Sequence, residues 1–449
     1  MRRRAEELGL GVNLTGRYTA VAEAEVLRAI ALCGWLSELR RGDVCVAQEG
    51  ARLSLNRWIA QGLRHAVRDG KRLFDVSEVL NHCLRQGRLG GDATWDRFLA
   101  QGRVQALAFR EPEGTAPPAT DATGRHDGAD WRLSLRREFN LEGRPPGPLL
   151  RLRVPIPYED STQEAIQVEP ILPPTERIQI RPARESLEVR LAAADAPGQR
   201  ITLGVDVSAR VYQRRVDVDP GRVAPYDPGS VEYALYTRPF DGLIRLSPEV
   251  RRVAAEVAGA LTNPWHIAEV LWSYLCDSLI LNFVHLTELD REDPLGWVLR
   301  NGWCDCYVGA ALFAGLCRAR GLPARVTGGI LLYSSISYFH YWAEVLIPPY
   351  GWVPMDPTSW SLAAGEGGTG YWAGFFRGRI DYRLKTECLP AIVTGPVGIR
   401  FPPEWYVVQT FEQGETQISY YDRSSGALLF RDRLRASRSE HIAGQPAEI

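Results

Sequence analysis

The sequence predicts an α+β protein made of several domains, and three observations support this fold class. The chain has 449 residues, a length that holds about two to four domains. Apolar residues recur at the helical period near the N-terminus, whereas residues from 131 onward alternate with the period of a strand. Helix-start signals then appear at Ser247 and Asn263. Helical and strand-like stretches that follow one another in blocks are typical of α+β proteins.

Composition and charge narrow the class of protein. Hydrophobic residues make up 45% and charged residues 24% of the chain, which excludes global disorder, collagen-like and coiled-coil architectures. The formal net charge is -1, so the overall charge predicts neither a nucleic acid nor a membrane as a partner. No apolar run suits a secretion signal or a membrane span, and the eight cysteines are too sparse for a disulfide framework. We therefore expect a cytoplasmic protein with reduced thiols.

Residues 1–110 are predicted to form a mostly helical domain whose role the sequence does not give. Segments 21–32 and 55–64 both place apolar residues three and four apart. The surplus of basic over acidic residues in this region is mild, so we expect a solvated surface and not a nucleic-acid site. Residues 111–130 are poor in large apolar side chains and rich in Pro, Gly and Thr, which predicts a linker.

Residues 131–242 are predicted to form an antiparallel β-sandwich-like domain. Trp131, Leu133 and Leu135 alternate with polar residues, and segments 187–191 and 201–207 repeat the pattern between turns rich in Pro, Gly and Asp. No convincing helix interrupts this region, which favours a sandwich packed on the domain that comes next in the chain. Residues 376–449 return to strand-like sequence with a hairpin signal at 424–426, and they are predicted to form a β-rich C-terminal extension.

Helix signals define the remaining region, residues 243–375. Pro248 and Pro264 each follow a capping residue and predict two helix starts. A third helix starts near Asp305 or Cys306, runs through small and apolar residues, and ends at Gly321. A thiol in its first turn would lie beside unpaired backbone N–H groups and the positive end of the helix dipole, and both lower its pKa. This position suits a nucleophile.

A predicted strand pair supplies two further side chains of the kind that take part in catalysis. Residues 338–347 alternate as a strand, a Pro-Pro-Tyr-Gly turn comes next, and residues 351–357 have the pattern of the hairpin partner. His340 and Asp356 are therefore expected on adjacent strands. A thiol nucleophile needs an imidazole base and a carboxylate or amide that orients the ring. Cys306, His340 and Asp356 supply these groups in that order.

The same blocks resemble a known family. Cys-x-Cys followed by a small residue, Leu-Cys-Arg-Ala-x-Gly-Leu-Pro-Ala-Arg, His-x-Trp-Ala-Glu-Val and Gly-Trp-Val-Pro-x-Asp-Pro-Thr together resemble the transglutaminase-like superfamily of papain-fold cysteine enzymes, over residues 243–362. The resemblance implies a papain-like catalytic core with no cofactor and no metal. Its spacing to Ala310 and Arg325 makes Cys306 the nucleophile. His340 is then the general base and acid, and Asp356 its orienting carboxylate.

Some assignments keep a second interpretation. Cys304 also precedes the helix and is the rival nucleophile, although a packing role is favoured. The second oxyanion donor is unassigned, with Trp303 and Asn301 as candidates, and Trp342 is either part of a substrate slot or a core residue. A zinc site that combines Cys304, Cys306 and Cys317 with His285 or His340 is disfavoured, because Cys-x-Cys lacks the usual two-residue spacing.

The predicted function is acyl transfer from an amide, of a peptide or a Gln side chain, through a thioester on Cys306. The partners would be a protein, peptide or small amide substrate and an amine acceptor. Water in place of the amine would make the same Cys, His and Asp set a cysteine peptidase or amidase. A non-catalytic scaffold or binding module of the same fold is the alternative from a different functional class.

Overall fold

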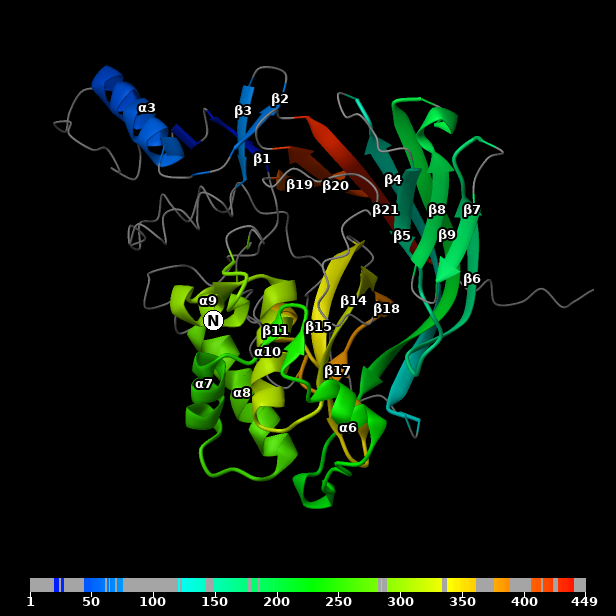
Figure 1. Ribbon diagram of the computed structural model, residues 1–449, viewed down its shortest axis with the longest axis vertical. Helices are drawn as coiled ribbons and strands as arrows, with labels where there is room; N and C mark the ends of the chain where they lie inside the picture. The colour runs from blue at the N-terminus through cyan, green and yellow to red at the C-terminus, as the bar shows by residue number, and fades with distance from the viewer. Residues whose placement is uncertain are drawn as a thin grey trace, which may run out of the picture.

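The computed structural model describes most of the chain from residue 120 onward and parts of the N-terminal region (Figure 1). The described residues are 20–23, 26–27, 44–60, 63, 65–68, 71–75, 120–121, 123–142, 149–175, 179–183, 186–196, 198–281, 284, 289–332, 337–360, 375–387, 405–412, 415–422 and 427–439. No helix in these ranges combines the length and the apolar character needed to cross a bilayer.

The described part of the N-terminal region contains helix α3, a few helical residues at 23 and 26–27, and a small sheet. Helix α3 (Val44–Ala60) includes most of the helix predicted over 55–64. Strands β1 (Ala20–Ala22), β2 (Ala66–Arg68) and β3 (Lys71–Asp75) form an antiparallel sheet in the order β1-β3-β2. Within the predicted helical segment 21–32, residues 21 and 22 belong to β1 and pair with β3, whereas residues 23, 26 and 27 are helical as predicted. Much of residues 1–110, including most of that segment, lies outside the described residues.

Two antiparallel sheets share a hydrophobic core in the β-rich part of the molecule. The larger sheet has the order β17-β9-β4-β21-β20-β19, with β6 also paired to β9, and the smaller one has the order β5-β8-β7. Alternate residues of β4 and β9 point into the same core as those of β5 and β8. The strands are β4 (Arg125–Asn140), β5 (Leu149–Pro155), β6 (Gln163–Ile171), β7 (Gln179–Ala183), β8 (Ser186–Ala192), β9 (Arg200–Arg215), β17 (Arg379–Ile380), β19 (Trp405–Glu412), β20 (Glu415–Asp422) and β21 (Leu428–Arg438).

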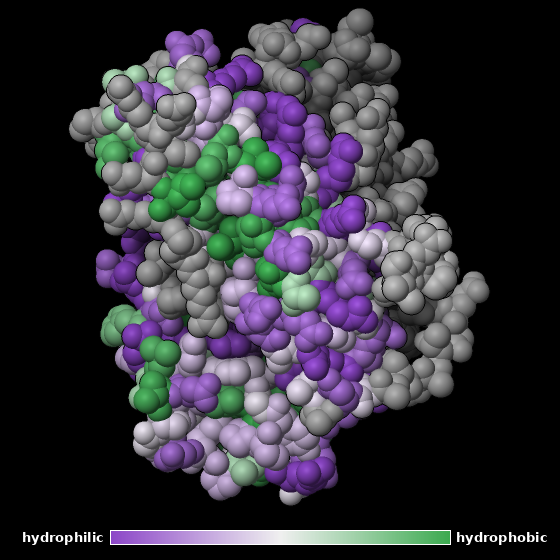
Figure 2. All heavy atoms as spheres, turned by 90° about the vertical axis from the view of Figure 1, so that its right-hand side faces the viewer, coloured by the Kyte–Doolittle hydropathy of each residue, from purple (hydrophilic) through white to green (hydrophobic). Residues whose placement is uncertain are grey.

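The small sheet has two edge strands with apolar side chains on the surface. Leu149 on β5 is 48% exposed and Ile180 on β7 is 45% exposed. Figure 2 shows the side of the molecule that carries β6 and β7, with hydrophobic residues gathered among hydrophilic ones. The alternation that predicted this region therefore buries one face of each strand and leaves the other in contact with solvent.

Three details of the β-rich region differ from the prediction. Strand β4 begins at Arg125, so the last six residues of the predicted linker 111–130 belong to a strand. A short helix, α6 (Val231–Tyr236), lies in a region where no helix was expected, and the Ser230 hydroxyl caps it. Strand β21 pairs with β4 along most of its length, so the C-terminal residues complete the large sheet. A local sequence pattern does not reveal the pairing of strands that lie so far apart in the chain.

A four-stranded sheet with helices on one face forms the region that carries the candidate site. Its order is β16-β15-β14-β18, and the strands are β14 (Ala324–Leu332), β15 (Ser337–Ile347), β16 (Gly351–Met355) and β18 (Arg383–Glu387). Helix α10 packs on β14 and β15, with the other helices around it (Figure 1). On the opposite face, Ile330, Leu332 and Leu384 join the core of the two β-sheets. The helices are α7 (Pro248–Ala258), α8 (Pro264–Ser278), α9 (Pro294–Asn301) and α10 (Cys306–Ala319).

The helix starts predicted in this region are confirmed. The Ser247 hydroxyl accepts a hydrogen bond from Val250 N at 3.3 Å, and Asn263 Oδ1 accepts one from Trp265 N at 3.0 Å. Helix α10 begins at Cys306 with Asp305 as its cap. Gly321 follows its C-terminus with φ of 77°, a left-handed conformation that favours glycine.

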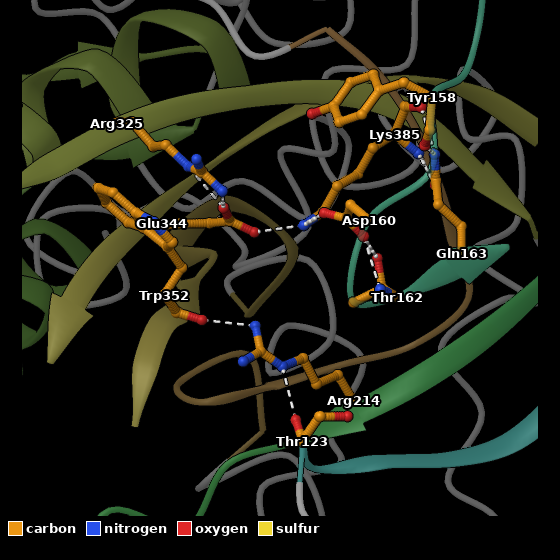
Figure 3. A network of polar contacts seen from close by, with 10 residues as sticks. All are labelled: Thr123, Tyr158, Asp160, Thr162, Gln163, Arg214, Arg325, Glu344, Trp352 and Lys385. Atoms are coloured by element: carbon orange, nitrogen blue, oxygen red, sulfur yellow. Dashed lines mark hydrogen bonds and ion pairs between the residues drawn. The ribbon is translucent and has the colours of Figure 1, made fainter. Parts of the chain in front are cut away.

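A buried network of charges connects the β-rich part to the four-stranded sheet (Figure 3). Lys385 Nζ of β18 lies 2.6 Å from Asp160 Oδ2 and 2.8 Å from Glu344 Oε1 of β15. Arg325 of β14 holds the other oxygen of Glu344 through Nε and Nη2, at 2.9 and 2.6 Å. The Gln163 amide bonds both the N–H and the carbonyl of Lys385. Opposite charges alternate in this network, so each buried charge has a partner.

We expect Lys385→Met to lower the free energy of unfolding by about 3 to 5 kcal/mol, because buried carboxylates would lose their ammonium partner. Urea denaturation of the full chain measures the change. Arg433→Met is the matched control, since Arg433 is exposed on β21 and its loss should cost less than about 0.5 kcal/mol. Equal losses in the two variants would show that the network does not stabilise the fold.

Candidate functional site

Cys306 occupies the first position of α10. The Asp305 carboxylate caps this helix by accepting a hydrogen bond from Val308 N at 2.8 Å. Among the cysteines that the structure describes, Cys276, Cys304 and Cys317 are buried, whereas Cys306 keeps part of its surface exposed. Reagents and substrates can therefore approach Cys306 more readily than these other thiols.

The rival residue Cys304 lies in a packed environment. It belongs to strand β13 (Trp303–Cys304), which pairs with β12 (Ile280–Leu281), and it has no exposed surface. A Cβ atom on Gly309 would lie only 2.9 Å from Cys304 Sγ. Gly309 therefore leaves the space that this sulfur fills, which supports the packing role that the sequence favoured for Cys304.

The predicted proximity of His340 and Asp356 is confirmed. His340 belongs to β15, Asp356 directly follows β16, and the two strands pair antiparallel. His340 Nε2 lies 2.8 Å from Asp356 Oδ2, and both side chains are buried. Since a carboxylate accepts hydrogen bonds, this contact assigns the proton of the neutral ring to Nε2 and makes Nδ1 the basic nitrogen.

Backbone contacts place the sulfur of Cys306 beside the strand that carries His340. Helix α10 packs on β15, and the rings of Tyr307 and Tyr341 lie 4.7 Å apart. The backbone N–H groups of Tyr341 and Tyr307 lower the pKa of the Cys306 thiol. Tyr307 follows Cys306 and Tyr341 follows His340 in the chain, so the start of α10 lies beside the part of β15 that carries His340.

The pKa of the Cys306 thiol differs from the sequence prediction. Burial raises this pKa most strongly, and the neighbouring Asp305 carboxylate raises it further. The N–H groups of Tyr341 and Tyr307 lower it, but they do not outweigh these effects. The direction is therefore opposite to the lowering that was expected from the helix N-terminus.

Two carboxyl groups near Cys306 are shifted in opposite directions. Burial raises the pKa of Asp305 to about 6, although the backbone N–H of Val308 lowers it. Burial also raises the pKa of Asp356, but the contacts with His340 and Arg383 outweigh it and hold that pKa well below its usual range. Of the two groups, only Asp356 has partners strong enough to offset its burial.

The remaining predicted residues lie in less suitable positions for their suggested roles. Asn301 Nδ2 donates to Trp297 O at 2.7 Å, so this amide already bonds its own helix. Trp303 is in β13, but its side chain lies outside the described residues. Trp342 has no exposed surface and stacks beside His340 with the ring centres 6.3 Å apart. This burial argues against a place for Trp342 in the wall of an open slot.

Two residues of the site were not identified from the sequence. Ser359 Oγ lies 3.2 Å from His340 Nε2, and Ser359 N donates to Asp356 Oδ1 at 2.9 Å. Arg383 Nη1 donates to Asp356 Oδ2 at 2.6 Å, although Arg383 lies on β18, in the predicted C-terminal extension. The position of Ser359 three residues after Asp356 is a signal for a capping contact. Nothing in the local sequence indicates Arg383.

Metal ligation has no support in the described part of the chain. Within it, no group of three or more His, Cys, Asp or Glu side chains is arranged to hold a metal ion. His285, one member of the zinc alternative, lies outside the described residues.

Comparison with known families agrees with the predicted resemblance. Residues 251–357, about a quarter of the chain, match the model of the transglutaminase-like superfamily. The predicted resemblance is thereby confirmed for the region that contains Cys306, His340 and Asp356.

A comparison with solved structures gives matches of low sequence identity. A protein from Cytophaga hutchinsonii with a provisional cysteine protease name is 13% identical, with a TM-score of 0.44 over 69% of this chain and 99% of its own. The periplasmic domain of TgpA from Pseudomonas aeruginosa is 16% identical, with a TM-score of 0.27 over 56% of this chain and 93% of its own. A provisionally named protease from Parabacteroides distasonis is 10% identical, with a TM-score of 0.23 over 68% and 69%. A comparison with curated proteins gives no significant match.

We expect Asp305→Asn to lower the pKa of the Cys306 thiol, because the substitution removes a neighbouring negative charge and asparagine still caps the helix. The rate of Cys306 alkylation by iodoacetamide as a function of pH, followed by mass spectrometry of the Cys306 peptide, measures this pKa. Asp293→Asn is the control, because Asp293 caps α9 in the same way through Gly296 N. A Cys306 profile that moves equally in both variants, or in neither, would contradict the role given to Asp305.

Proposed function

We propose that this chain is a transglutaminase-like cysteine acyltransferase that acts on amide bonds through Cys306, His340 and Asp356. One observation carries the proposal: Cys306 begins helix α10, which packs on β15, and on that strand His340 Nε2 lies 2.8 Å from Asp356 Oδ2. The family match over residues 251–357 supports the same chemistry.

The first half of the proposed reaction forms a thioester. His340 Nδ1 removes the proton of the Cys306 thiol while the sulfur attacks the amide carbonyl, and the carbonyl oxygen takes the negative charge. The Cys306 backbone N–H, in the first turn of α10, is a donor for this oxyanion. When the intermediate collapses, the C–N bond breaks and His340 gives the proton to the departing amine. A neutral amine leaves, and the acyl group remains on the sulfur.

The second half transfers the acyl group to an acceptor. An amine attacks the thioester, loses a proton to His340 and forms a new amide, and Cys306 leaves with that proton as a thiol. The chain has only two lysines, Lys71 and Lys385. Lys385 is buried and paired with two carboxylates, so it is not an acceptor. We infer that the acceptor amine belongs mainly to another molecule.

Water could replace the amine in the second half and yield a carboxylic acid. The site would then act as a cysteine amidase or peptidase, with the same thioester and the same three residues. The two activities differ only in the nucleophile that reaches the thioester.

We expect Cys306→Ala to reduce hydroxamate formation from a glutamine-containing peptide and hydroxylamine by on the order of 10⁴-fold, since the thioester cannot form. Cys304→Ala is the matched control and should retain activity of the wild-type order. Colorimetric detection of the hydroxamate measures both variants, and thermal unfolding checks that each is folded. Activity that survives in Cys306→Ala would exclude Cys306 as the nucleophile. Absence of hydroxamate with the wild-type protein and a panel of amides would favour a non-catalytic scaffold.

We expect the thioester to partition toward amines, so that increasing hydroxylamine raises hydroxamate at the expense of the carboxylic acid. Mass spectrometry separates the two products, because hydroxamate and acid differ in mass. A product that remains the acid at every hydroxylamine concentration would assign the chain to the amidases or peptidases and exclude acyl transfer to amines.

A further inference from the structure

Arg383 is a buried cation in contact with the candidate site. Its side chain has no exposed surface, and Nη1 lies 2.6 Å from Asp356 Oδ2. Nη2 donates to Ser359 Oγ at 3.4 Å, and Nε donates to Asp381 Oδ1 at 3.0 Å. The three guanidinium nitrogens thus contact three side chains, two of which also contact His340.

Aromatic rings complete the surroundings of this guanidinium. The Trp342 ring centre lies 4.9 Å from Arg383 Cζ, and the Phe376 ring centre lies 5.5 Å from it. Rings at these distances attract a cation, and they exclude water from it. The position of Arg383 is therefore fixed on several sides, and the residue cannot leave Asp356 without leaving a buried charge unpaired.

We propose that Arg383 is a positioning residue of the candidate site, which orients Asp356 and Ser359 against the ring of His340 and offsets part of the charge of Asp356. The inference rests on the proposed function, because it describes how the same histidine is prepared to act as a base. Arg383 itself touches neither the sulfur nor a substrate in this account.

Charge balance supports this role. Asp356 Oδ2 accepts hydrogen bonds from both Arg383 Nη1 and His340 Nε2. Arg383 also contacts a second carboxylate, Asp381, through Nε. The guanidinium therefore offsets part of the negative charge of Asp356, and Asp381 limits how much it offsets. Without Arg383, the Asp356 carboxylate would attract a proton on His340 more strongly.

The other charged groups around His340 do not replace Arg383. Glu344 lies farther along the same face of β15, where Arg325 and Lys385 bind it. Because alternate residues of a strand share a face, Arg383 and Lys385 of β18 project toward the same side of the sheet. Lys385 forms ion pairs with Glu344 and Asp160.

The helices and the outer strands add few charges near the ring. Helix α10 contributes Cys306 and its cap, Asp305. Near helix α8, Glu269 is paired with Arg377. Strand β20 approaches β15 through Thr416, which donates to the Ser337 carbonyl. Within the described residues, Arg383 is therefore the cation that contacts the partner carboxylate of His340.

The test compares variants that change charge in opposite directions. Arg383→Gln removes the cation, and the pKa of His340 should rise by about one unit, because an unbalanced carboxylate favours the imidazolium. Asp381→Asn removes the carboxylate that faces the far side of Arg383, and the pKa of His340 should fall. Arg383→Lys keeps the positive charge but loses the several hydrogen bonds that the branched guanidinium makes. The pKa of His340 should therefore stay near the wild-type value, while kcat falls and KM is unchanged.

Two readouts separate this inference from the proposed function. Histidine-selective isotope labelling reports the pKa of His340 by NMR without any substrate, with His340→Ala to identify its signal. In Arg383→Gln, the acid limb of the pH profile of hydroxamate formation should shift to higher pH, because His340 must be neutral to act as the base. Arg325→Gln, which removes another cation from the same sheet, is the control that should move neither readout.

Each result either supports or contradicts the role proposed for Arg383. Opposite shifts of the His340 pKa in Arg383→Gln and Asp381→Asn would support the role of Arg383, even if the wild-type protein formed no hydroxamate and the proposed function failed. If Arg383→Gln did not fold, a downward shift in Asp381→Asn with an unchanged value in Arg383→Lys would still support it. A pKa of His340 that equals the wild-type value in Asp381→Asn and in any folded Arg383→Gln would overturn it.

Discussion

The hydrogen bond between His340 and Asp356 is the contact on which the candidate site depends. Both side chains are buried, and a buried carboxylate without partners would take up a proton. Asp356 avoids this because the ring of His340, the N–H of Ser359 and the guanidinium of Arg383 surround it. The same contacts fix the orientation of the ring. In the proposed mechanism they leave Nδ1 as the nitrogen that exchanges a proton with Cys306.

Strand β18 makes that arrangement part of the whole fold. Arg383 reaches Asp356 from this strand, and two residues farther along Lys385 binds Asp160 and Glu344. The residues on its opposite face, such as Leu384, join the hydrophobic core of the β-rich region. A change in how the β-rich region packs on the four-stranded sheet would therefore move Arg383 and Asp356 together.

The sequence predicts the parts of the fold and site that depend on local patterns. Capping residues located the starts of α7, α8 and α10, and the alternation on either side of a turn brought His340 and Asp356 together. The contribution of Arg383 could not be predicted, because β14 and β18 pair across a long stretch of chain. The same limit applies to β21, which pairs with β4. The lowered pKa expected for Cys306 failed for a related reason, since the helix terminus is visible in the sequence whereas the burial of the thiol is not.

Burial and the Asp305 carboxylate raise the pKa of the Cys306 thiol. In the proposed mechanism the sulfur therefore loses its proton to His340 as it attacks, when the developing oxyanion carries the negative charge away from Asp305. A thiol that keeps its proton until then resists oxidation and alkylation better than a thiolate does. The proposed mechanism thus links the reactivity of Cys306 to the presence of a bound carbonyl group.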